Sequence, residues 1–357
     1  MKVLHVITTL NSGGAEKMLV DIVNEMKIQG ISCEVAVLTK TQNFFGKQFE
    51  KLNIPVYYGP TSKVYSIKNI FWLKNIITKQ NYNYIHTHLF ASQLFMPIAL
   101  KLANNKAQLI TTEHSTHNKR RETKVFYWLD YWLYLQYDKI IAITKDTKKN
   151  LNSYLPSTLK KTVVIENGID VLQYSESTAI DKYELSPEIA ENDKLILMVA
   201  AMRDQKDHET LIRASKLLPS NYRVIFVGDG ERMEEVKQYA LEYGSNTILF
   251  LGRQTDVPAI MKASDVFVLS SKWEGFGLVA VEAAATGLPV VASDVKGLSE
   301  VVNTIGGQVF EPFNEEELAK KIIEAIHQKK DDYNVSSYAI QTTVQKYINL
   351  YKESLKE

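Results

Sequence analysis

Short apolar runs alternate with helix-length amphipathic segments along the whole chain, and this alternation constrains the fold more than any other feature. Apolar runs such as Val3–Thr8, Tyr84–His88 and Val266–Ser270 have the length of single strands. Segments with helical periodicity, such as Ala15–Gln29 and Leu278–Thr286, lie between the runs. Because strands buried on both faces are continuously apolar, the pattern predicts parallel sheets covered by helices on both sides.

The alternation is interrupted once, near residues 168–192, where the sequence is polar and shows no clear period. A chain of 357 residues also exceeds one comfortable hydrophobic core. We therefore predict an α/β protein with two Rossmann-like, doubly wound domains, residues 1–168 and 169–339, that face each other across a cleft. A last helix, at about residues 340–357, is expected either to pack on its own domain or to cross back to the first.

Composition excludes several classes of protein. The chain lacks the roughly 18 consecutive apolar residues of a membrane span, its first residues are too short for a signal peptide, and one cysteine permits no intrachain disulfide. These features favour the cytoplasm. The net charge of +1 hides an asymmetry, with 22 Lys and Arg against 12 Asp and Glu in residues 1–170, and 20 against 29 in residues 171–357. The basic half predicts either an anionic partner or a solvated surface without a partner.

The loops after strands carry the candidate binding residues, because ligands of parallel sheets bind beyond the carboxyl ends of the strands. Gly13 and Gly14 precede a helix, where they would let the backbone approach a ligand or simply form a tight turn. His114 follows the fifth strand and could donate to a sugar hydroxyl or serve the structure alone. His86 and His88 are spaced for a metal, but no cysteine or compact carboxylate set accompanies them. We expect this pair to be structural.

In the second half, Arg203 and Lys206 lie in the loop before a helix. Two cations beside a helix N-terminus form an anion site suited to a diphosphate. The alternative is a loop whose cations pair with Asp204 or Asp207.

The most specific signal is the run from residue 270 to residue 287. A strand ends there, a loop with Gly275 and Gly277 follows, and a helix opens near Leu278. The backbone amides of Phe276, Gly277 and Leu278 would then point at an anion.

Two carboxylates flank the start of this helix. Glu274 lies in the loop, at the height of a sugar, and Glu282 lies about one turn into the helix, where it could bind a ribose diol. Small apolar neighbours surround Glu282, so its burial would be costly without a partner.

The two carboxylates resemble the Glu-x7-Glu motif of glycosyltransferase family 4, whose members are retaining enzymes with the GT-B fold. Other stretches across nearly the whole chain resemble the same family: Gly13–Glu16, His114, Glu166–Asp170, Gly228–Gly230, Gly252–Arg253 and Gly287–Ala292. The resemblance implies transfer of a sugar from a nucleotide-diphosphate donor, UDP by family frequency, to a glycan or lipid-linked acceptor in the assembly of a surface polysaccharide. It implies neither a metal ion nor another cofactor.

The resemblance also implies a role for each matching residue. His114 and Glu274 would contact the sugar, and Glu282 would bind the ribose. Lys206 and Arg203 would hold the diphosphate, together with the amides near Gly277 and Leu278. Gly14 would lie against the diphosphate and sugar, Gly252 and Arg253 would lie beside the base, and Gly228 would also belong to the donor site. One position departs from the family pattern. The family places its arginine five residues before the lysine, where this chain has Ala201, and Arg203 stands only three residues before Lys206.

The residues suggest no enzyme nucleophile, so we expect front-face attack by the acceptor hydroxyl, with the leaving diphosphate as proton acceptor. Residues 119–137 combine basic and aromatic side chains. They predict either a peripheral contact with an anionic membrane at its inner face or a packed helix. A nucleotide-sugar epimerase and a non-catalytic partner of the same fold remain alternatives. A nucleic-acid-binding protein is not expected, because the sequence contains no recognisable reading module.

Overall fold

The structure is a computed structural model that describes the chain except residues 12, 42, 117–118, 246–247, 328–332 and 355–357. It consists of two compact units, one made of Met1–Gly168 with the stretch from Ile340 onward, the other of Ile169–Ala339. We call them unit 1 and unit 2.

Unit 1 contains a seven-stranded parallel sheet in the order β3-β2-β1-β4-β5-β6-β7. Its strands are β1 Lys2–Ile7, β2 Ser32–Val37, β3 Val56–Tyr58, β4 Tyr84–His88, β5 Gln108–Glu113, β6 Lys139–Ala142 and β7 Thr162–Val164. Its helices are α1 Gly14–Ile28, α2 Gly46–Lys51, α3 Lys68–Lys79, α4 Phe90–Leu102, α5 Lys124–Leu135, α6 Lys145–Tyr154 and α15 Ile340–Ser354, with 3-10 turns η1 Lys119–Glu122 and η2 Pro156–Thr158. The central strands β1 and β4 are buried on both faces, as predicted, although His5, His86 and His88 interrupt their apolar sequence.

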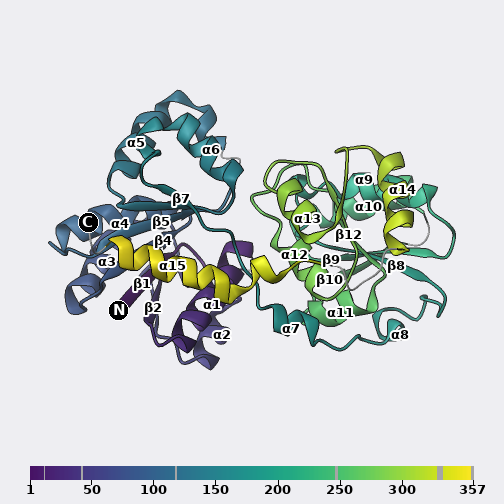
Figure 1. Cartoon of the computed structure of the whole chain (residues 1–357), viewed down its shortest axis with the longest axis horizontal. Coiled ribbons are helices and arrows are strands. Elements are labelled where there is room, and N and C mark those ends of the chain that lie inside the picture. Colours follow the sequence, from purple (N-terminus) through teal and green to yellow (C-terminus); the bar gives the residue numbers. More distant parts are fainter. Residues whose placement is uncertain (12, 42, 117–118, 246–247, 328–332, 355–357) are drawn as a thin grey trace. The chain divides into compact units, whose positions relative to one another are not determined.

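The last helix crosses back to unit 1, which decides the alternative that the sequence left open. Helix α15, yellow in Figure 1, runs beside α1. Its Tyr351 ring stacks on Tyr84 of β4 with centroids 4.7 Å apart, and the Tyr84 hydroxyl donates to the Tyr351 carbonyl oxygen. Lys346 pairs with Glu166 at 3.0 Å. The final residues of the expected helix, 355–357, lie outside the described part of the chain.

Unit 2 contains a six-stranded parallel sheet in the order β10-β9-β8-β11-β12-β13. Its strands are β8 Lys194–Val199, β9 Tyr222–Val227, β10 Ile248–Gly252, β11 Val266–Leu269, β12 Val290–Ser293 and β13 Gln308–Phe310. Its helices are α7 Val171–Ser175, α8 Lys182–Leu185, α9 His208–Ala214, α10 Met233–Tyr243, α11 Val257–Ala263, α12 Leu278–Ala285, α13 Ser299–Ile305 and α14 Glu315–Ile326, with 3-10 turns η3 Asp204–Lys206, η4 Ser215–Leu217 and η5 Ser336–Tyr338. Both units are therefore doubly wound, Rossmann-like α/β domains.

The polar stretch at 168–192 holds two short helices that the sequence pattern did not reveal. Asp170 and Asp181 are their N-caps, and each side chain accepts a hydrogen bond from a backbone amide of the first turn. Helices of five and four residues are too short to show a hydrophobic period.

Strand order locates the crevice of each sheet. In unit 1 the order reverses between β1 and β4, and in unit 2 between β8 and β11. Ligands of doubly wound sheets bind at such switch points, beyond the carboxyl ends of the strands. The loops after β1, β4, β8 and β11 are therefore where a site is expected.

Candidate active site

The loops after β8 and β11 lie next to each other, because these strands pair at the centre of the unit 2 sheet. The Lys272 amide donates to the Gln205 carbonyl oxygen at 2.8 Å, and the Gln205 side chain donates to the Trp273 carbonyl oxygen at 2.8 Å. These two hydrogen bonds bring together Lys206 and Glu274, which are 68 positions apart in the sequence.

Lys206 and Glu274 form an ion pair between Nζ and Oε1. Glu274 is only 7% exposed, and its Oε1 also accepts a hydrogen bond from Ser271 Oγ at 2.9 Å. The sequence analysis did not single out Ser271, although a hydroxyl three residues before a buried carboxylate is a recognisable local partner. A charged ligand at this crevice would meet a cation and a carboxylate that are already fixed in direction.

The N-terminus of α12 follows directly. Gly277 is its N-cap in the left-handed region, at φ +85°. A Cβ at this position would also collide with the Leu298 side chain, so the turn requires glycine for both angle and space. The Phe276 ring is buried against Tyr338, edge to face, with ring centroids 5.5 Å apart. The first amides of a helix lack intrahelical partners and favour an anion, and here they begin at Leu278.

Glu282 lies one turn into α12 and is half-buried, although its neighbours Val281 and Ala283 are fully buried. Because Glu282 is partly exposed, its carboxylate avoids most of the free-energy cost of burying a charge. Gly275 lies half-buried in the loop between Glu274 and the helix. The two carboxylates thus flank the N-terminus of α12, as the motif implied.

The ends of β9 and β10 also meet in unit 2. The Gly228 amide donates to the Gly252 carbonyl oxygen at 2.8 Å, and both glycines have positive φ angles, +141° and +65°. Arg253 lies 3.4 Å from Asp229 in a half-exposed ion pair. Arg203 is exposed and precedes η3, so it lies near Lys206 in sequence but outside the ion pair with Glu274.

In unit 1, Gly13 is the N-cap of α1, which begins at Gly14. A Cβ at Gly13 would collide with the carboxylate of Glu16, which also accepts a hydrogen bond from Thr9 Oγ1 at 3.0 Å. Glu16 is buried, at 7% exposed. Gly13 has an ordinary extended φ of −117°, so a side chain there would have to displace the Glu16 carboxylate but would meet no backbone strain.

His114 follows β5 and is half-buried. Its Nε2 lies 3.3 Å from Nδ1 of His88, the last residue of β4. Burial lowers the pKa of His114 to about 4, although the neighbouring Glu113 raises it in part. His114 is therefore neutral at physiological pH.

Glu113, directly before His114, anchors the following loop. Its carboxylate accepts hydrogen bonds from Arg121 (2.7 Å), Gln93 (3.1 Å) and the Tyr134 hydroxyl. These partners, with Arg121 foremost, hold the pKa of Glu113 below its usual value despite complete burial. The buried carboxylate therefore supports the backbone from which His114 projects.

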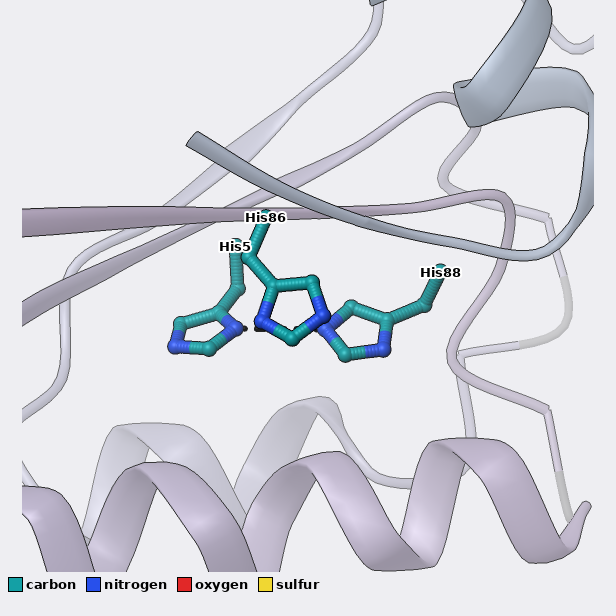
Figure 2. A group of neighbouring side chains, drawn as sticks. All are labelled: His5, His86 and His88. Atoms are coloured by element: carbon teal, nitrogen blue, oxygen red, sulfur yellow. Dashed lines mark hydrogen bonds between the residues drawn. The ribbon is translucent and has the colours of Figure 1, made fainter. Parts of the chain in front are cut away.

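His86 and His88 are joined by a third histidine that the sequence analysis missed. His5 of β1 lies opposite His86 in the sheet register, and all three rings are fully buried or nearly so. Figure 2 shows the rings, with a hydrogen bond of 3.2 Å between His5 Nδ1 and His88 Nε2. His5 and His88 are 83 residues apart in the sequence, which is why no local sequence signal reveals their contact.

The three histidines do not suit a metal ion as they are arranged. One nitrogen from each lies within 4.8 Å of the others, but His86 uses Nδ1 for Tyr351 Oη and Nε2 for Thr112 Oγ1, both at 2.7 Å. Its ring also stacks on His88, with centroids 4.4 Å apart and an angle of 24°. A metal must lie in the plane of each ligating ring, at an unpaired nitrogen.

The fold and these sites define a class of protein, a glycosyltransferase with the GT-B fold. Two family models match successive parts of the chain, glycosyltransferase family 4 over residues 12–172 and glycosyl transferases group 1 over residues 180–342. The chain belongs to the glycosyltransferase family 4 group of GT-B enzymes.

Relatives and solved structures agree with this assignment. The chain is 30% identical to the Escherichia coli UDP-Gal:alpha-D-GlcNAc-diphosphoundecaprenol alpha-1,3-galactosyltransferase, over 68% of this chain and 66% of that protein. A glycosyltransferase from Rickettsia africae superimposes with a TM-score of 0.84 at 25% identity, covering 100% of this chain and 99% of the other. The Anabaena protein HepE in complex with UDP and glucose also has a TM-score of 0.84, at 22% identity, covering 99% of this chain and 100% of HepE.

Proposed function

We propose that this glycosyltransferase moves a sugar from a UDP-sugar to a glycan or lipid-linked acceptor with retention of configuration and without a metal ion. The observation that carries the proposal is the Lys206–Glu274 pair beside the N-terminus of α12, at the switch point of unit 2. The choice of UDP is supported by the UDP-sugar named for the Escherichia coli relative and by the UDP bound to HepE.

The cations and dipoles of unit 2 are matched to a departing diphosphate. Lys206 and the amides at Gly277 and Leu278 provide positive charge and partial positive charge at one place. Arg203 extends this charge on the exposed side of the loop. Because such groups neutralise the charge that develops on the leaving oxygen, they can take over the work that a divalent cation performs in other transferases.

The transfer is a single displacement at the anomeric carbon. The bond between that carbon and the diphosphate oxygen breaks, and the acceptor hydroxyl oxygen bonds to the same face. The hydroxyl proton passes to the departing diphosphate oxygen. Glu274, held by Lys206 and Ser271, orients the sugar, and Glu282 binds the ribose. In unit 1, His114 is the candidate sugar contact. Positioning and leaving-group stabilisation supply the rate gain.

A thermal-shift panel of UDP, GDP and ADP, with and without EDTA, tests the donor. UDP at about 100 times its Kd adds roughly 2.7 kcal/mol of stability, and EDTA leaves this gain unchanged. Turnover of UDP-sugars in the presence of acceptor, followed by NMR of the new anomeric linkage, tests retention. Loss of the UDP shift on adding EDTA contradicts the metal-free proposal, and product formed without acceptor indicates an epimerase. No shift with any nucleotide indicates a non-catalytic protein.

The acceptor proposal is supported by the surface of α5. Val125, Trp128 and Trp132 are 78%, 72% and 43% exposed, while Leu133 and Tyr134 on the opposite side are buried. Tryptophan at this exposure is unusual in water and typical of a membrane interface. The exposed residues recur at helical spacing, so they form one face of α5.

Basic side chains lie on α6, a helix that shares η2 with α5 as a neighbour. Helix α6 contributes Lys145, Lys148 and Lys149 to a pocket of about 510 Å³. A lipid-linked phosphate in an anionic leaflet would be attracted to these lysines. No helix in the described part of the chain is long and apolar enough to span a bilayer.

Sedimentation with vesicles tests the membrane contact. The protein binds phosphatidylglycerol-containing vesicles more tightly than pure phosphatidylcholine vesicles, and a Trp128→Ala/Trp132→Ala variant loses at least about tenfold in affinity. An exposed substitution elsewhere, Leu241→Ala on α10, serves as the matched control, because Leu241 is 82% exposed in unit 2. Equal binding by all three proteins contradicts the contact.

A further inference from the structure

A row of three histidines leads from the interior of unit 1 to the candidate sugar contact. His5 Nδ1 lies 3.2 Å from His88 Nε2, and His88 Nδ1 lies 3.3 Å from His114 Nε2. His5 and His88 are 0% and 1% exposed, and His114 is half-buried at the end of the row. Each imidazole of this histidine row contacts the next through its ring nitrogens.

A neutral imidazole has one N–H donor and one acceptor nitrogen. When each ring shares a hydrogen bond with the next, the tautomer of one ring dictates the tautomer of its neighbour. Only two arrangements are self-consistent. Either His5 donates to His88 and His88 donates to His114, or both hydrogen bonds run the other way. All three pKa values are lowered by burial, so the rings are neutral in either arrangement.

The inner end of the row decides between the two arrangements. His5 Nε2 is buried and has no hydrogen-bond partner among the described residues. If the bonds ran inward, this nitrogen would carry an unpaired N–H, whereas outward bonds leave it only an unpaired lone pair. Orphaned buried N–H groups are rarer and costlier than under-satisfied acceptors. The outward direction is therefore favoured.

We propose that His5 and His88 are positioning residues that fix His114 as the Nδ1–H tautomer, so that its Nδ1 donates a hydrogen bond to the transferred sugar. The inference rests on the proposed function for the identity of the ligand, but the tautomer itself does not. His114 Nε2 is occupied by His88, which leaves Nδ1 as the nitrogen available to a sugar hydroxyl oxygen.

His86 provides a matched control within the same strand. It is as buried as His88 and stacks on it, but its nitrogens bond Tyr351 and Thr112 rather than the histidine row. A substitution at His86 therefore disturbs packing without removing the donor to His114.

Histidine-labelled ¹⁵N NMR of the full chain, which distinguishes Nδ1–H from Nε2–H imidazoles, is the first test. We expect His114 as the Nδ1–H tautomer in the wild-type protein without ligand. His88→Leu should abolish this preference, His88→Asn should restore it by donating from its side-chain amide, and His86→Leu should leave it unchanged. An Nε2–H His114 in the wild type, or an unchanged tautomer in His88→Leu, overturns the proposal.

Kinetics provide the second test. His88→Leu should lower kcat/KM for sugar transfer on the order of tenfold, the value of one hydrogen bond, and His88→Asn should recover most of it. The UDP thermal shift should stay unchanged in both variants, because UDP lacks the transferred sugar that His114 is proposed to contact. If the wild-type chain does not bind UDP, the proposed function is refuted. The NMR measurement still tests the His114 tautomer in that case, because it needs no ligand. Equal kcat/KM in His88→Leu and wild type overturns the positioning role.

Discussion

At the scale of single residues, the Lys206–Glu274 pair explains how a site for a charged ligand can exist before the ligand arrives. Each side chain restrains the other, and Ser271 adds a third point of attachment. A preformed cation needs no reorganisation when charge develops on a leaving group. The same ion pair should also contribute to the free energy of unfolding of unit 2.

Lys206→Ala should therefore reduce activity and stability together. We expect kcat to fall by at least about 100-fold, because the leaving diphosphate loses its cation. The free energy of unfolding should fall by about 1–3 kcal/mol, since Glu274 remains buried without its charge partner while Lys206 itself is partly exposed. Steady-state kinetics and urea unfolding measure the two effects.

Lys272→Ala is the control for this prediction. Lys272 pairs with Asp204, whose side chain is 61% exposed, in the neighbouring loop. An exposed pair contributes less than about 1 kcal/mol. If Lys206→Ala and Lys272→Ala had the same turnover, Lys206 would not be the cation at the diphosphate.

At the scale of elements, the start of α12 depends on one backbone conformation. Gly277→Ala should destabilise the chain by about 2–4 kcal/mol, because the left-handed angle and the collision with Leu298 add to each other. The UDP thermal shift should shrink as well, since the amides at the helix N-terminus move. Urea unfolding and the shift assay test this.

Gly30→Ala separates the two causes. Gly30 has nearly the same φ, +76°, but a Cβ there has nothing within 4 Å. This variant should lose only about 1–2 kcal/mol, the cost of the left-handed conformation alone. Equal losses in Gly277→Ala and Gly30→Ala would show that the contact with Leu298 does not matter.

The elements also show how far sequence reasoning reaches. Strand β4 begins and ends where the run Tyr84–His88 predicted, and β1 and β11 differ from their predicted runs by no more than one residue at either end. The local sequence suffices to locate a strand that is buried on both faces. Two contacts depend on which strands are neighbours in the sheets. One is the ion pair between Lys206 and Glu274, which also binds Ser271, and the other is the contact between His5 and His88. Strand order is a long-range property, so the residues could be named as candidates but their partners could not.

At the scale of the whole molecule, buried histidines make stability depend on pH. Burial lowers the pKa of His5 and His208 to about 3 and of His114 to about 4, and those of His86 and His88 well below the usual value. The unfolded chain therefore binds more protons than the folded chain below about pH 6.5. Stability is complete above that pH and is lost as the pH falls towards 4.

Urea unfolding at pH 7.0 and 5.5 should show a loss of about 3–5 kcal/mol, on the order of 1 kcal/mol for each imidazole. Asp207 opposes the trend in part, because burial raises its pKa to about 6 and the folded chain then takes up a proton. His208→Leu, at a ring that packs against Phe226, should reduce the loss by about 1 kcal/mol. Equal stability at both pH values would contradict buried neutral imidazoles.

The chain leaves unit 1 at Gly168 and returns at Ile340, and both crossings lie close together. Thr343 Oγ1 donates to the Glu166 carbonyl oxygen at 3.0 Å on the unit 1 side, and Ile169 pairs with Ala339 on the unit 2 side. Unit 1 is thus continuous in space although it is interrupted in sequence. A linker of about four Gly and Ser residues, with a reach of about 13 Å, should join residue 168 to residue 340.

The joined chain should fold by itself, whereas residues 1–168 alone should not. Without α15, Tyr84 loses the ring of Tyr351 stacked on it and His86 loses the Tyr351 hydroxyl, so a buried polar face of the sheet is opened to water. Circular dichroism with urea should give a cooperative transition for the joined chain and none for residues 1–168. Tyr351→Ala in the joined chain should lower its free energy of unfolding by about 3–5 kcal/mol. Equally cooperative unfolding of residues 1–168 would mean that α15 covers unit 1 without being part of its core.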